Sequence, residues 1–209
     1  ELWQKPPGVP AAATLTLSIE PNGEIHVDEL AATAPTARIA ANAVLEPGGR
    51  LVRASAEEVF VEGLLDVALM ADRAGQEDDR LHIAVNGSYL NARTLFDELP
   101  FPRTGGSDGT SSGLPFLFEA GVDTVEVRGE SFTNARLYLD SVERGIRGFS
   151  FSGQTRAGPV EVRFGPDGDL EGPRQLVVNS ADASALLRAF TGFDNASGGE
   201  LYLEAREIG

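Results

Sequence analysis

Alternation of apolar and polar residues with a period of two is the feature that most constrains the fold of this chain. In residues 14–20, Leu15, Leu17 and Ile19 alternate with polar side chains. Successive side chains of a β-strand point to opposite faces of a sheet, so this pattern predicts strands with one buried and one solvated face. Three further segments alternate in the same way, with apolar positions at Leu81, Ile83 and Val85, at Val160, Val162 and Phe164, and at Leu201, Leu203 and Ala205.

Turn signals separate the alternating segments. Pro21-Asn22-Gly23, Pro47-Gly48-Gly49 and Ala157-Gly158-Pro159 each combine residues that adopt the backbone angles of tight turns. Short strands joined by such turns favour antiparallel pairing between consecutive strands. The sequence therefore predicts a mostly-β fold, a long antiparallel meander of about a dozen strands.

Two short amphipathic helices are expected to interrupt the meander. Asn91 and Asp182 are suitable N-cap residues, because their side chains can accept hydrogen bonds from free backbone amides of a first helical turn. Apolar residues follow each cap at helical spacing, namely Ala92, Leu95, Phe96 and Leu99 in the first segment and Leu186, Leu187 and Phe190, with Phe193 as a further candidate, in the second. We expect each helix to cover an open end or flank of the sheet, with a moving lid as the alternative.

The two helical segments lie at a constant offset of 91 residues, which suggests two related units. Residues 103–113, RTGGSDGTSSG, are rich in Gly and Ser and are predicted to form a flexible loop. The expected division is a first β-rich unit over residues 1–102 and a second over residues 114–209. Whether these are separate domains or halves of one sheet stays open, although strand edges at the boundary favour one continuous sheet.

Composition and motifs argue against most kinds of catalytic site. The chain has no Cys and only two His, and it contains neither an EF-hand calcium loop nor a Gly-x-Ser-x-Gly nucleophile elbow. Acidic clusters at residues 57–58, 77–79 and 167–169 are expected to be solvated. The net charge of −15 disfavours nucleic acid as a partner. We therefore predict no catalytic residue, no metal site, no cofactor and no enzymatic activity.

The apolar strand faces must be covered in some way. A β-sandwich, a closed barrel, or a curved sheet that holds an apolar guest would each achieve this. Lipid is the obvious guest for a curved sheet, and on the alternation pattern alone a sandwich core without a ligand remains equally open. The chain contains no run of 18 apolar residues that would span a membrane, and its first residue, Glu1, suggests a processed protein or an excised domain.

Residues 179–205, NSADASALLRAFTGFDNASGGELYLEA, resemble the C-terminal signature of the AsmA-like superfamily (AsmA, YhdP and TamB type). The resemblance rests on "D-A-x-A-L-L-R", an aromatic residue, and then "D-N-x-x-G-G-x-L" leading into a strand. Residues 72–100, centred on VNGSYLNARTLFDEL, are similar to a companion domain of YhdP-type members, with Asn91 in place of the more usual Asp. Residues 114–165 fit the β-rich middle of the same family more loosely.

The resemblance implies a periplasmic fragment of an inner-membrane-anchored protein, with a curved, groove-like sheet (an open half-barrel) that holds phospholipid acyl chains for transport towards the outer membrane. The alternative function is a structural or assembly module of outer-membrane biogenesis that binds an envelope protein. The family implies no catalytic residues. The expected lipid-binding residues are the alternating apolar positions Leu15, Leu17, Ile19, Leu81, Ile83, Val85, Val160, Val162, Phe164, Leu201 and Leu203.

Overall fold

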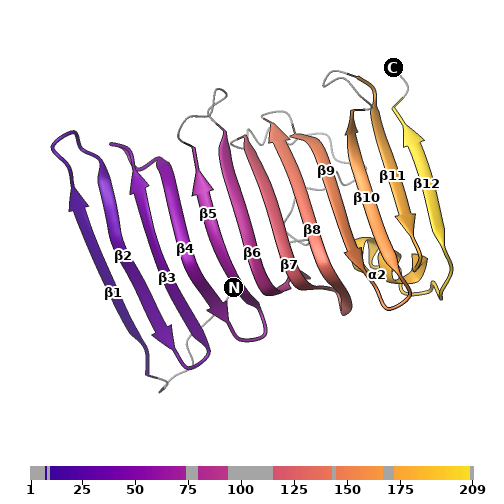
Figure 1. Cartoon of the computed structure of the whole chain (residues 1–209), viewed down its shortest axis with the longest axis horizontal. Helices are drawn as coiled ribbons and strands as arrows, with labels where there is room; N and C mark the ends of the chain where they lie inside the picture. Colours follow the sequence, from indigo (N-terminus) through magenta and orange to yellow (C-terminus); the bar gives the residue numbers. More distant parts are fainter. Residues whose placement is uncertain are drawn as a thin grey trace.

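Twelve strands form one open, curved sheet in the computed structural model, which describes residues 8, 10–73, 80–93, 115–142, 145–166 and 172–207 (Figure 1). The strands follow one another across the sheet in chain order, so β1 and β12 form its two edges. The strands are β1 (Ala12–Ile19), β2 (Ile25–Ala34), β3 (Ala37–Leu45), β4 (Leu51–Val61), β5 (Leu65–Asp72), β6 (Leu81–Asn91), β7 (Phe116–Val127), β8 (Glu130–Val142), β9 (Gly145–Gln154), β10 (Pro159–Pro166), β11 (Arg174–Ser180) and β12 (Leu201–Arg206).

The predicted mostly-β fold is confirmed, and the sheet does not close into a barrel. Strands of both predicted units pair within this one sheet, because β6 lies beside β7. The predicted loop at 103–113 and most of the first predicted helix lie outside the described residues. At the start of that helix, the Arg93 amide donates to Asn91 Oδ1 at 3.2 Å, which is the contact expected of a capping side chain.

The sheet departs from the predicted antiparallel meander at one position. β6 and β7 pair in parallel, with Val85 opposite Ala120, whereas the neighbouring pairs on either side are antiparallel. Parallel neighbours need a crossover of about a dozen residues or more to return the chain to the same end of the sheet. The segment between Asn91 and Phe116 is long enough for such a crossover, whereas a tight turn would be too short.

Extra residues in several strands keep apolar side chains on one face where strict alternation fails. Asp28 is the additional residue of β2 opposite β1, so Val27 and Leu30 pair with Leu17 and Leu15. Each such β-bulge shifts the alternation of its strand by one residue. In β6 the bulge lies next to Gly87, where an added Cβ would lie 2.3 Å from the backbone oxygen of Asp66, so only glycine fits.

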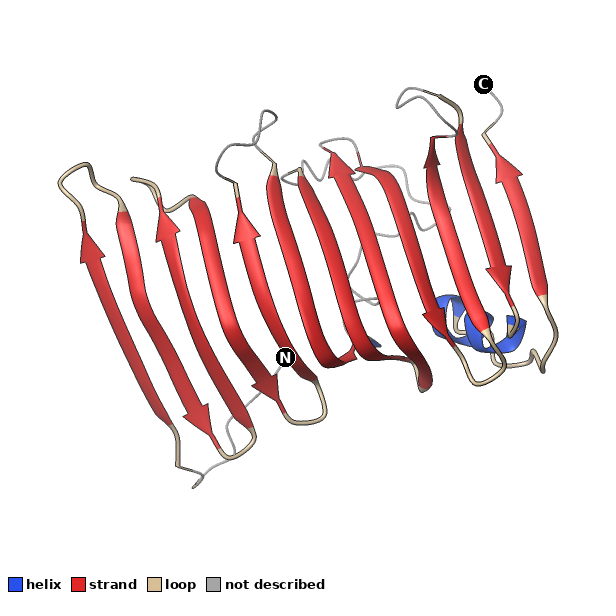
Figure 2. Ribbon diagram, in the orientation of Figure 1, coloured by secondary structure: helices blue, strands red, loops and turns tan. Residues whose placement is uncertain are grey.

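Helix α2 (Ala183–Thr191) begins and ends as its sequence predicts. The Ala185 amide donates to Asp182 Oδ1 at 3.0 Å, and Ser184 Oγ donates to the same oxygen at 2.7 Å. Gly192, with φ of 71°, ends the helix in the left-handed conformation, which glycine adopts without strain. Figure 2 shows the helix behind the sheet, near one end of β10 and β11.

The cap of α2 leads to a pH-dependent prediction. The hydrogen bond from the Ala185 amide, followed by that from Ser184, lowers the pKa of the Asp182 carboxyl from its ordinary value of 3.8. A carboxyl with a lowered folded-state pKa stabilises the fold above its unfolded pKa, and this contribution is lost as pH falls through the folded pKa. Asp182→Ala should therefore cost about 1 kcal/mol at neutral pH. Urea denaturation measures the free energy of unfolding of the variant and of the unmodified protein. The difference between them should be smaller in acid below that pKa. An equal difference at both pH values would contradict a stabilising role for the ionised Asp182 carboxylate.

Candidate functional site

One face of the sheet is apolar from edge to edge. Residues directly opposite one another in paired strands share a face, so the register can be followed across the sheet. A first row takes one residue from every strand: Leu15, Leu30, Ala41, Ala56, Leu69, Val85, Ala120, Leu137, Phe151, Val162, Val178 and Leu203. We call the face that carries this row the apolar face.

A second row runs parallel to the first on the same face. It also has one member in every strand: Leu17, Val27, Ala43, Ala54, Ala71, Ile83, Phe118, Leu139, Phe149, Phe164, Leu176 and Ala205. No polar side chain interrupts either row. An unbroken apolar surface of this kind must be covered by protein or by an apolar ligand.

All eleven residues expected from the sequence to bind lipid lie on the apolar face. Leu15, Val85, Val162 and Leu203 belong to the first row, and Leu17, Ile83 and Phe164 belong to the second. The other four lie two residues from a row member in the same strand and therefore on the same face: Ile19, Leu81, Val160 and Leu201.

Exposure divides the apolar face into an open part and a covered part. At the β1 edge, Leu15, Leu17 and Ile19 are 59%, 52% and 67% exposed. In contrast, Val85 and Val160 are buried. Leu203 is 40% exposed, and Leu81, Ile83, Phe164 and Leu201 are half-buried. Only part of the predicted set is therefore accessible to a ligand.

Helix α2 covers the apolar face over β7–β11. Phe190 of the helix lies 5.4 Å from the ring of Phe151 and 6.3 Å from that of Phe132. Val160 and Val162 belong to the same buried cluster, and Leu201 packs against it. The predicted helical stripe is confirmed for Leu186 and Phe190, whereas Phe193, the further candidate, is 52% exposed and follows the helix.

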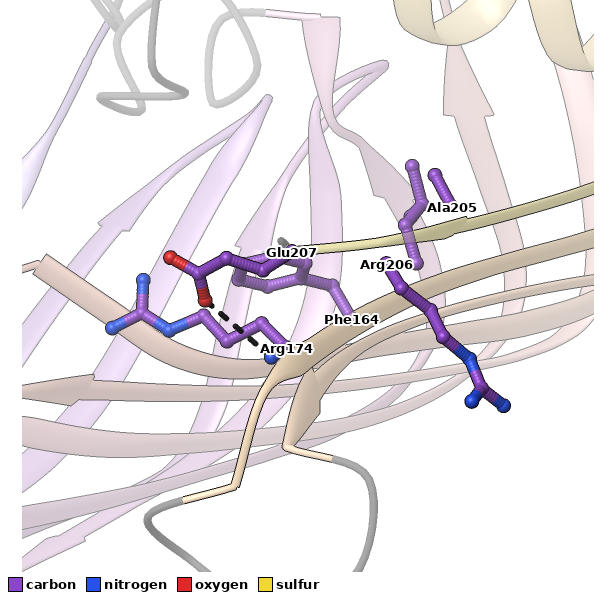
Figure 3. Close-up of a pocket in the computed structure, with 6 residues that line it drawn as sticks. Phe164, Arg174, Ala205, Arg206 and Glu207 are labelled. Atoms are coloured by element: carbon purple, nitrogen blue, oxygen red, sulfur yellow. Dashed lines mark hydrogen bonds between the residues drawn. The ribbon is translucent and has the colours of Figure 1, made fainter. Parts of the chain in front are cut away.

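A shallow pocket of about 310 Å³ lies on the apolar face away from α2. Phe164 and Ala205 line its apolar floor together with Leu176. Arg174 and Glu207 stand at its rim, on the same side of the strands as Phe164, and Arg206 points away from them (Figure 3). The Arg174 guanidinium lies 5.9 Å from the centre of the Phe164 ring, and this geometry is typical of a cation–π contact.

The opposite, polar face carries a buried ion-pair cluster. Asp140 of β8 accepts a hydrogen bond from Arg80 Nη1 at 2.7 Å and another from Arg147 Nε at 2.7 Å. The Asp140 side chain is only 6% exposed. This cluster ties the start of β6 to β8 and β9 across the parallel β6–β7 pair, which indicates a structural role.

The described residues present no recognisable centre for acid–base or metal chemistry. On the polar face, Tyr89 Oη donates to Glu126 Oε2 at 2.8 Å, and this hydrogen bond raises the pKa of the Tyr89 phenol. A phenol with a raised pKa is a poorer nucleophile at neutral pH. Within the described ranges, no three His, Cys, Asp or Glu side chains gather as metal ligands would. Of the predicted acidic clusters, residues 77–79 and 167–169 lie outside those ranges, and Glu58 forms an ion pair with Arg38.

Sequence reasoning missed the apolar-face residues of β2–β5, such as Val27, Leu30 and Leu69. In β2 the pair Asp28-Glu29 separates two apolar residues that share a face, because Asp28 is a bulge residue. In β4 the pair Glu57-Glu58 interrupts the alternation in the same way, because Glu57 is a bulge residue. An apolar residue on each side of two consecutive acidic residues was the available signal.

Comparison of this chain with protein-family models, with curated proteins and with solved structures finds no match. In the part of the chain that the structure describes, no helix has the length and apolar character needed to cross a membrane. The candidate site is therefore defined by its own geometry, an extended apolar face that is open at β1 and covered by α2 near the other edge.

Proposed function

We propose that this chain is a non-enzymatic module of a bridge-like lipid-transfer protein, whose apolar face holds the acyl chains of phospholipids. The supporting observation is the pair of unbroken apolar rows across all twelve strands, with exposed leucines at the β1 edge. Each CH₂ group that an acyl chain withdraws from water onto this face would contribute about 0.8 kcal/mol. Binding of this kind needs no specific polar chemistry.

The proposal assigns different roles to different parts of the face. Leu15, Leu17 and Ile19 are exposed and would contact the acyl chain directly, as would the half-buried Ile83 and Phe164. The buried Val160 and Val162 would support the sheet beneath α2 instead. A lipid that lies along the rows would therefore run from β1 towards the helix.

The proposed setting is the periplasm, within an inner-membrane-anchored protein that moves phospholipid towards the outer membrane. Support for this part of the proposal is the resemblance of residues 179–205 to the AsmA-like C-terminal signature. A second candidate function, a structural or assembly module that binds a protein partner, is supported by the open edge of β1, which carries no charged residue.

Two double variants on β1 test lipid binding with a matched control. Leu15→Asp/Leu17→Asp places two carboxylates on the apolar face, and Thr14→Asp/Thr16→Asp places two on the polar face of the same strand. All four residues are exposed, so both proteins should fold. We expect only the leucine variant to lose bound phospholipid, on the order of tenfold or more, because two apolar contacts are removed.

The measurement is native mass spectrometry after incubation with vesicles of phosphatidylethanolamine and phosphatidylglycerol. The unmodified chain should retain phospholipid, and the threonine variant should retain it equally. Absence of lipid from the unmodified chain, or equal loss in both variants, would contradict the proposal. Val85→Asp and Val162→Asp should instead unfold the protein, because both side chains are buried.

A further inference from the structure

The outer edge of β1 is the most exposed edge of the sheet. All eight residues of β1 are exposed, and among the described strands only β2 pairs with it. The backbone N–H and C=O groups of an edge strand that point away from its neighbour are free to pair with another strand. β1 therefore presents a row of backbone donors and acceptors over its whole length.

β1 lacks the features that usually prevent edge-to-edge association. Its sequence, AATLTLSI, contains no charged residue, no proline and no glycine, and the bulge residue of the β1–β2 pair, Asp28, belongs to β2. Edge strands of soluble proteins are usually protected by charges, prolines or bulges. The other edge strand, β12, follows that rule, because it carries Glu204 and Arg206.

The sequence of β1 is complementary to itself in an antiparallel arrangement. When Thr16 lies opposite Thr16 of a second copy, Leu15 lies opposite Leu17, and Ala13 lies opposite Ile19, all on the apolar face. On the polar face, Thr14 lies opposite Ser18. A shift by one residue would place Leu17 opposite Thr16 and mix the two faces, so registers offset by one residue are disfavoured.

We propose that β1 is a self-recognition edge that pairs antiparallel with β1 of a second copy, about a two-fold axis at Thr16. Pairing about an axis perpendicular to the sheet keeps both apolar faces on the same side, so the apolar rows of one copy continue into the other. The net charge of −15 on each copy opposes association, and the uncharged edge strand places no like charges directly opposite each other. Added salt should therefore favour the dimer. The pairing does not depend on lipid.

Single cysteines map the pairing, because the natural chain has none. Thr16→Cys should form a covalent dimer on oxidation or with a short bis-maleimide, since the two side chains face each other across the axis. Thr14→Cys and Ser18→Cys should cross-link poorly alone and efficiently when mixed. Tyr202→Cys on the exposed polar face of β12 is the control and should remain monomeric. Equal cross-linking at Thr16 and Tyr202, or none at Thr16, would overturn the proposal.

Opposite charges at Thr16 provide an independent test. Thr16→Lys and Thr16→Glu should each be monomeric in sedimentation velocity, because two like charges would lie directly opposite each other. An equimolar mixture of the two should dimerise. If the unmodified chain remains monomeric at high concentration and added salt, or if the mixture behaves like its separate components, the two-fold pairing is wrong. Open-ended assemblies with cross-links between Thr16→Cys and Tyr202→Cys would also overturn it, in favour of head-to-tail association through β12.

Discussion

Replacing Phe132 by alanine should destabilise the protein by about 3–5 kcal/mol, the usual cost of removing a buried aromatic side chain. Phe132 is fully buried on the apolar face of β8. Its ring lies 5.3 Å from that of Phe151 in an edge-to-face arrangement and 6.3 Å from that of Phe190. Loss of the ring would leave a cavity between the sheet and α2, which the neighbouring strands cannot easily fill.

Urea denaturation followed by circular dichroism measures this effect as a lower transition midpoint. Phe193→Ala is the matched control, because Phe193 is also a phenylalanine, directly follows the cap of α2 and is 52% exposed. We expect the control to stay within about 0.5 kcal/mol of the unmodified protein. Similar midpoints for the Phe132 and Phe193 variants would mean that the contact between α2 and the sheet contributes little to stability.

Replacing Asp140 by alanine should also be strongly destabilising, at about 3 kcal/mol. The variant leaves the guanidinium groups of Arg80 and Arg147 without the carboxylate that both contact. Arg80 is 16% exposed and Arg147 is 32% exposed, so water can reach Arg147 more easily. We therefore expect a loss of unfolding free energy at the lower end of the range that is typical when one partner of a buried ion pair is removed.

An exposed ion pair on the same face supplies the control for Asp140. Glu58 and Arg38 approach to 2.7 Å, but their side chains are 45% and 49% exposed. Ion pairs in water contribute at most about 1 kcal/mol, so Glu58→Ala should have a small effect. Raising the salt concentration should reduce that effect further. A loss for Asp140→Ala as small as that for Glu58→Ala would indicate that water screens the Asp140 cluster as well.

Local sequence patterns were sufficient for the strands with regular alternation and for α2. Leu15, Leu17 and Ile19 occupy a strand without a bulge residue of its own, so a period of two described it correctly. Asp182 and Gly192 cap α2 through contacts within a few residues of the chain. Such features depend on neighbouring residues alone, which is why they could be predicted from the sequence.

Patterns of this kind failed where a strand is irregular or where its partner is distant. The bulges at Asp28 and Glu57 conceal the apolar face of β2 and β4, because an extra residue reverses the alternation. The parallel pairing of β6 with β7 joins strands that are separated by a long segment of the chain, and no local pattern marks their relative direction. The Asp140 cluster joins residues up to 60 positions apart, and no short motif marks it.

The alternation of apolar and polar residues determined by itself that the chain forms one-sided strands, and it identified eleven residues that share a face. That result follows because the direction of a side chain in a strand is a local property of the backbone. Only the tertiary structure decided that seven of these residues belong to two continuous apolar rows across a single open sheet, and that α2 covers one part of the face while β1 remains exposed. Those features depend on strand register and helix docking, which arise from contacts between distant parts of the chain.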